Sequence, residues 1–167
     1  MGSSDTSARP ETGQPGADQP RFTVDCKVGR LVEARLYLLQ SADEVTVFQA
    51  AMRDVFRRAG PRSIICADWR AASLLAPEVA DAMIGLLRVG NAFFERSAIL
   101  LGQDKALFNM QVERVVREAA NPSRRTFRDP LKMRRWLAEV LDNAEIRRMN
   151  EFFREVRRAV PDEDEGS

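Results

Sequence analysis

Short apolar segments of strand length alternate with longer segments of helical periodicity, and this alternation restricts the fold more than any other feature of the sequence. The strand-like segments lie at residues 22–28, 31–39, 63–67, 96–101 and 124–128. Apolar side chains at helical spacing follow Ser41, Pro77, Asp104 and Asp129. This order, β-β-α-β-α-β-α-β-α, predicts an α/β domain with a largely parallel sheet.

Local signals predict where these elements begin and end. The first two strands are separated only by a turn at Gly29, so we expect an antiparallel hairpin that makes the sheet mixed. Ser41 and Glu44 form a capping-box pattern at the start of the first helix. Asp104 and Asp129 stand where they can cap two later helices.

The chain divides into a predicted domain and three flanking segments. Residues 1–20 contain no aromatic residue and no Ile, Leu or Val, so we expect a disordered tail. The domain spans residues 21–142, and residues 161–167 form an acidic tail that we also expect to be disordered. Residues 143–160 predict an additional amphipathic helix that carries Phe152 and Phe153. The sequence leaves open whether this helix is continuous from Pro130 or breaks near Asp142 and Asn143.

The composition excludes several kinds of catalytic and metal site. The 167 residues include no histidine, so His-dependent nucleophiles, His general bases and His metal ligands are absent. Cys26 and Cys66 are too few for a zinc site and too far apart for a C-x-x-C redox pair. No apolar segment approaches the roughly 20 residues of a membrane-spanning helix, and the start is polar. We therefore expect a cytoplasmic, non-enzymatic protein without a cofactor or metal.

Three segments resemble the STAS domain of sulfate transporters and anti-sigma-factor antagonists. They are the hairpin at 22–39, the sequence S-I-I-C-A-D at 63–68, and F-R-D-P-L-K-M-R-R-W-L at 127–137. The chain is most similar to the single-domain, STAS-like (SpoIIAA-like) branch, and the resemblance covers about residues 21–142. It implies a bacterial regulatory or signalling module that binds another protein.

The resemblance supports the fold better than it supports a phosphorylation switch. Anti-sigma-factor antagonists carry an Asp-Ser-Ser/Thr-Gly acceptor motif in the loop that follows the third strand. The corresponding position here falls near Ala76 or Pro77, and neither residue can be phosphorylated. Ser73 is the only hydroxyl residue in this loop and could be a phosphorylation site. The alternative is that its hydroxyl stabilises a turn or caps a helix.

Six residues are candidates for binding a partner protein: Asp68, Trp69, Arg70, Ser73, Phe152 and Phe153. The first four follow a predicted strand, where α/β sheets commonly bind ligands and partners. The alternative is that the side chain of Trp69 folds back and covers the core, while Asp68 caps the segment that follows it. The two phenylalanines must be buried against the same domain, a second copy of the chain, another protein or a membrane surface.

A basic stretch lies between residues 113 and 135, with eight basic and three acidic residues. The members that we single out are Arg124, Arg125, Arg128, Arg134 and Arg135. An acidic protein or an anionic membrane surface suits this charge, and a solvated surface is the alternative. No nucleic-acid motif accompanies it, so we do not expect nucleic acid as the partner.

Two functions follow from these observations. The first is a regulatory module that binds a partner protein through the loop at 68–77, the C-terminal helix, or both. The second is a carrier or sensor of a small apolar or lipid-like ligand, suggested by several apolar helix faces over one sheet and by the basic residues.

Overall fold

A five-stranded mixed sheet forms the centre of the molecule. The computed structural model describes residues 20–158 and the side chains as far as Glu155. Strands β1 (Phe22–Asp25), β2 (Leu31–Leu36), β3 (Ser63–Asp68), β4 (Phe94–Leu100) and β5 (Arg124–Phe127) lie in the spatial order β1-β2-β3-β4-β5. β1 is antiparallel to β2, and the other neighbours are parallel. The predicted α/β class with a mixed sheet is confirmed.

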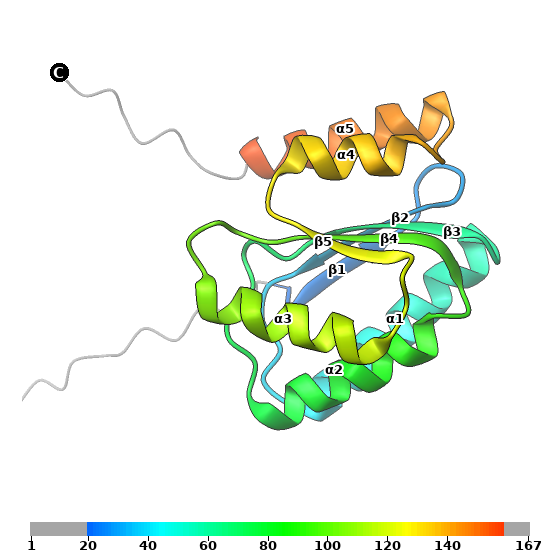
Figure 1. Cartoon of the computed structure of the whole chain (residues 1–167). Helices are drawn as coiled ribbons and strands as arrows, with labels where there is room; N and C mark the ends of the chain where they lie inside the picture. Colours follow the sequence, from blue (N-terminus) through cyan, green and yellow to red (C-terminus); the bar gives the residue numbers. More distant parts are fainter. Residues whose placement is uncertain (1–19, 159–167) are drawn as a thin grey trace, which may run out of the picture.

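Helices cover both faces of this sheet (Figure 1). Helices α1 (Ala42–Ala59), α2 (Pro77–Gly90) and α3 (Ala106–Ala119) lie on one face. Helices α4 (Pro130–Ala138) and α5 (Asn143–Arg158) lie side by side on the other. Because both faces are covered, the central strand β3 is buried at all six positions, as is typical of parallel sheets.

Most predicted helix ends are found where the sequence placed them. The Ser41 hydroxyl accepts a hydrogen bond from the Glu44 amide at 3.2 Å, and α1 ends at Gly60, whose φ is +89°. Asp129 caps α4 by accepting from the Leu131 amide at 2.9 Å. The predicted cap at Asp104 is wrong, because α3 begins one residue later, after Lys105, which makes no side-chain capping bond.

The structure resolves the alternative at the end of the chain, because α4 and α5 are separate helices. The Asp142 carboxylate accepts from the Glu145 amide at 2.8 Å, and the Glu145 carboxylate accepts from the Asp142 amide at 2.9 Å. This reciprocal capping box starts a new helix at the position where the sequence left a break open.

Helix α5 is joined to the sheet by polar contacts as well as apolar ones. The carboxylate of Glu145, which is 2% exposed, also accepts from the Arg30 amide at 2.8 Å. Arg148 donates two hydrogen bonds to Glu33 of β2, at 2.6 and 2.7 Å. The predicted tails at 1–20 and 161–167 lie outside the described residues except for Pro20, as do residues 159 and 160 of the predicted C-terminal helix.

Candidate functional site

The residues predicted at the carboxyl end of β3 are mostly buried. Asp68 is 5% exposed and accepts three hydrogen bonds from Arg70, from its amide, Nε and Nη2, at 3.1, 3.0 and 2.8 Å. This bonding raises the pKa of the Arg70 guanidinium. The side chain of Trp69 is 3% exposed, and Ser73 is exposed. Arg70 and Ser73 are therefore the two predicted loop residues whose side chains a partner can reach in this conformation.

Helix α3 holds the same loop in place. Lys105 donates to the Ala72 carbonyl at 2.8 Å. The Gln111 amide group accepts from the Leu75 amide at 2.9 Å and donates to the Leu75 carbonyl at 2.8 Å. Ala76 and Pro77 form the N-cap and first turn of α2. The loop is thus a supported segment, with the backbone of Ala72 and Leu75 bonded to Lys105 and Gln111.

Phe152 and Phe153 pack on their own domain. They are 1% and 7% exposed, and they share an apolar cluster with Leu31, Ile64 and Cys66 of the sheet. The sequence left four alternatives for the surface that buries these side chains, and the structure shows burial against the same domain. Their predicted contact with a partner or a second copy stays a prediction, and it requires α5 to leave the sheet.

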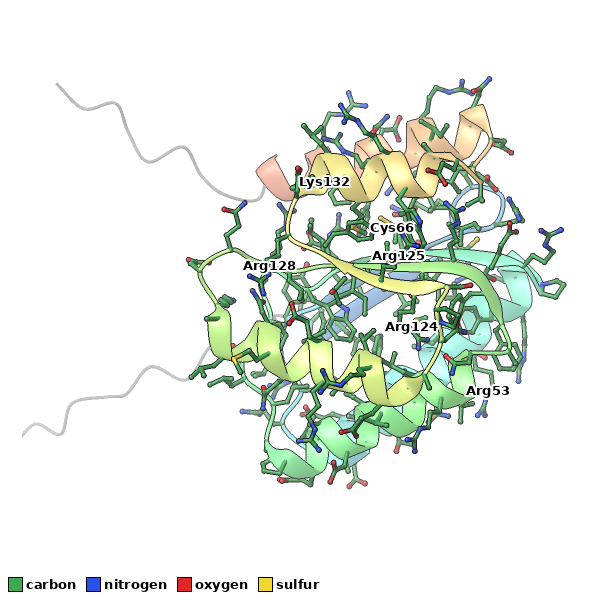
Figure 2. All side chains as sticks on the ribbon, in the orientation of Figure 1. Arg53, Cys66, Arg124, Arg125, Arg128 and Lys132 are labelled. Carbon is green, nitrogen blue, oxygen red and sulfur yellow. The ribbon has the colours of Figure 1, made fainter. Side chains whose placement is uncertain are left out.

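The five arginines of the predicted basic patch do not form one surface. Arg124 is 5% exposed and faces α2, whereas its neighbour Arg125 is exposed and its guanidinium lies 5.0 Å from the Trp136 ring of α4. Figure 2 labels both residues on β5. Arg128 pairs with Glu113 at 3.0 Å. The remaining two, on α4, are the half-buried Arg134 and the exposed Arg135.

A cavity of about 480 Å³ lies between α1, α2 and the sheet. Its floor includes Ala34 of β2 and Ala67 of β3, which are partners in the sheet register. Their short side chains leave space beneath the two helices. The surrounding walls are apolar and include Phe48, Met52, Phe56, Ile65, Trp69, Leu86, Leu87 and Ile99.

The cavity reaches the protein surface near the last turns of α1 and α2. Its lining there includes Arg57, Val89 and Phe93, and all three side chains are exposed. Phe93 stacks on Phe56 with ring centroids 5.6 Å apart. Arg53, also exposed and labelled in Figure 2, adds a second exposed cation to the lining. A ligand therefore has a route from solvent through an aromatic and cationic entrance.

Three buried side chains in the mainly apolar lining carry polar groups. Trp69 and Arg124 are buried, and the indole Nε1 of the first and the Nε of the second have no hydrogen-bond partner. Ser97, 3% exposed, is the register partner of Arg124, and its hydroxyl bonds to no described residue. Burial lowers the pKa of the Arg124 guanidinium to about 10.

The described residues offer no metal centre. Within residues 20–155, no group of three or more Cys, Asp or Glu side chains is arranged to hold an ion. Burial raises the pKa of both thiols, Cys26 and Cys66, which disfavours the reactive thiolate.

Sequence reasoning placed Trp69 and Arg124 among the candidates but missed the cavity that joins them. It also missed Ser97, Ala34 and Ala67. The available signal was the pair of small residues within apolar strands, at Ala34 in L-V-E-A-R-L and Ala67 in S-I-I-C-A-D. That signal becomes informative only when the strand register shows that the two residues are neighbours.

In the part of the chain that the structure describes, no helix has both the length and the apolar character needed to cross a bilayer. Comparison of the sequence with protein-family models and with curated proteins found no match.

Proposed function

We propose that this protein is a non-enzymatic binding module that holds a small, mainly apolar ligand in the cavity between α1, α2 and the sheet. The observation that carries the proposal is the cavity itself. Its volume of about 480 Å³ lies within the roughly 300–1,000 Å³ range of small-molecule sites. Its lining also has the usual character of such sites, with apolar and aromatic walls and a few polar groups.

The origin of the cavity supports a binding role over a local packing fault. Protein interiors are close-packed, and few contain voids much larger than a water molecule. Here the space follows from two alanines placed side by side in β2 and β3, beneath two long helices. The exposed Val89 and Phe93 at the entrance are apolar groups that a ligand with a hydrocarbon body can contact as it enters.

A variant that fills the cavity tests the proposal. We expect Ala67→Met to lower the affinity for the neutral fluorescent probe N-phenyl-1-naphthylamine by about tenfold or more, because the new side chain occupies the binding volume. Ala82→Met is the matched control, since Ala82 lies on α2 outside the cavity lining. Equal probe binding by wild type and Ala67→Met would contradict the proposal.

Urea unfolding of Ala67→Met and Ala98→Met shows whether the cavity accepts a larger side chain. Ala98 is fully buried in the apolar cluster on the opposite face of the sheet. Overpacking there should cost about 1–3 kcal/mol, whereas a methionine at position 67 has room and should cost less than about 1 kcal/mol. Similar losses of stability at the two positions would show that the cavity does not accept a larger side chain.

We also propose that the protein is a STAS-like regulatory module. The five-stranded mixed sheet, with an antiparallel first pair and helices on both faces, is compatible with that fold. In this proposal the protein is cytoplasmic, α5 is an addition to the family pattern, and ligand occupancy sets its regulatory state.

Binding of a partner protein is the second candidate function, and an exposed apolar surface favours it. Leu74 of the β3–α2 loop and Leu107 and Met110 of α3 are 57%, 67% and 64% exposed, and they line a shallow groove with Arg114 and Arg117. A purified partner should bind the Leu74→Ser/Met110→Ser variant at least tenfold more weakly in calorimetry. Val47→Ser, at an exposed apolar position on α1, is the control. An unchanged affinity would exclude this groove.

A further inference from the structure

The polar groups in the cavity lining define the chemistry of its ligand. Arg124 is the first residue of β5, and its side chain leaves the sheet on the face covered by α1–α3. One N–H of Nη1 donates to the Asn91 amide oxygen at 2.9 Å, and one of Nη2 donates to the Leu87 carbonyl at 3.2 Å. A guanidinium has five N–H groups, so three remain without a partner among the described residues.

Arg124 also lacks a counter-ion. Two arginines are buried among residues 20–155, Arg124 and Arg148, and only Arg148 forms ion pairs with described carboxylates. Arg148 pairs with Glu33, Glu151 and Glu155. Arg124 forms no ion pair with any described carboxylate, and its guanidinium instead lies 4.8 Å from the ring centroid of Phe94. A buried charge is normally paired, because an unpaired one loses its hydration without compensation.

The surroundings of Arg124 suit an anion at one end of the cavity. Ser97 lies directly beside it in the β4–β5 register, so its hydroxyl is available on the same face. A guanidinium and a hydroxyl on neighbouring strands are both donors to an oxyanion, and charge-assisted bonds of this kind are about twice as strong as neutral ones. Arg53 and Arg57 bring two further cations to the lining, whereas no Asp or Glu contributes to it.

We propose that the ligand is a single-chain amphiphile whose anionic oxygen-containing head group pairs with Arg124 and Ser97, while its hydrocarbon chain fills the apolar part of the cavity. This inference rests on the proposed function, because it assigns the head group of the ligand that the cavity holds. It gives that ligand one negative charge and places this charge beside Ser97, in the middle of β4, and Arg124, at the amino end of β5.

Calorimetry with two ligands of equal chain length tests the assignment without any variant. At about pH 8, octanoate is ionised and Arg124 is protonated. We expect octanoate to bind the full chain about tenfold or more tightly than octan-1-ol, since only octanoate forms a charge-assisted bond. Equal affinities for octanoate and octan-1-ol would overturn the assignment of an anionic head group, but they would still support an apolar binding site. Absence of binding by either ligand, together with failure of N-phenyl-1-naphthylamine to bind, would overturn the proposed function itself.

Variants then locate the head group. Arg124→Met should lose the preference for octanoate over octan-1-ol. Arg125→Met is the matched control, because the neighbouring side chain faces α4, and it should keep the preference. Ser97→Ala should reduce the preference while leaving Arg124 in place, which keeps the test decisive if Arg124→Met does not fold. A preference as large as that of the wild type in both Ser97→Ala and Arg124→Met, or in Ser97→Ala alone if Arg124→Met does not fold, would overturn the assignment.

Octyl phosphate distinguishes the kind of oxyanion. A preference for octanoate over octyl phosphate supports a carboxylate ligand such as a fatty acid, whereas the reverse order supports a phosphorylated amphiphile. Either order supports an anionic head group provided that octan-1-ol is the weakest of the three ligands, and octan-1-ol as the tightest would overturn it.

Discussion

The buried pair between Glu33 and Arg148 should respond unequally to loss of either partner. Its two hydrogen bonds are 2.6 and 2.7 Å long, and the side chains are 4% and 9% exposed. Breaking a buried ion pair costs about 3–5 kcal/mol, because the remaining charge stays buried. In Arg148→Met, Glu33 has no other cation among the described residues. We therefore expect a loss of about 4 kcal/mol in the free energy of unfolding.

Loss of the carboxylate should be less damaging. In Glu33→Gln, Arg148 keeps Glu155 at 2.9 Å and Glu151 at 3.3 Å, both of which remain partly exposed to solvent. We expect a loss of about 2 kcal/mol, below the range for an orphaned buried charge. The double variant Glu33→Leu/Arg148→Met leaves no charge unpaired between the two positions, so it should be more stable than Arg148→Met alone.

Urea unfolding at neutral pH measures these differences. With a slope of about 2 kcal/mol per molar urea, the Arg148→Met variant should unfold at a urea concentration lower by about 2 M. The exposed pair between Asp54 and Arg57 is the control, with a similar distance of 3.0 Å but side chains 70% and 71% exposed. Arg57→Met should lose at most about 1 kcal/mol. The reasoning is refuted if Arg148→Met and Arg57→Met lose the same stability.

Two further predictions follow from other parts of the structure. Gly29→Ala should lose about 2 kcal/mol or more in urea unfolding, because φ is +55° and the new Cβ would contact the Glu145 carboxylate. Gly85→Ala, with open space around its position in α2, should gain about 0.5–1 kcal/mol, and a loss at both sites would contradict this account. Octanoate affinity should persist below about pH 10 and fall as the pH rises further, because the lowered pKa of Arg124 removes the charge that attracts the anion. Calorimetry across this range should show no such fall for Arg124→Met.

The fold was accessible from the sequence because its local signals agree with one another. Ser41 with Glu44, Gly60, and Asp129 with Pro130 each combine a capping or terminating residue with the periodicity next to it. Asp104 misled because a carboxylate near a helix start is a common cap, yet Lys105 separates it from the helix.

The candidate site was less accessible, because it depends on contacts between strands. In the four-residue strand R-R-T-F, two adjacent arginines give no apolar alternation to indicate which one faces the core. Packing against Leu87 and Phe94 decides this, and both are distant in sequence from Arg124. Trp69 follows a strand, where an exposed binding residue is common, but its side chain is 3% exposed and lines the cavity instead.

Helix α5 follows all five strands in the sequence, and this order has a consequence for synthesis. Chains emerge from the ribosome with the amino end first, and domains acquire their folds in that direction. One face of the sheet, with Leu31, Ile64 and Leu100, is covered by a helix that carries Phe152. The contact between Glu33 and Arg148 spans 115 residues. A nascent chain that has completed all five strands therefore still exposes the apolar side chains on this face of the sheet until α5 emerges.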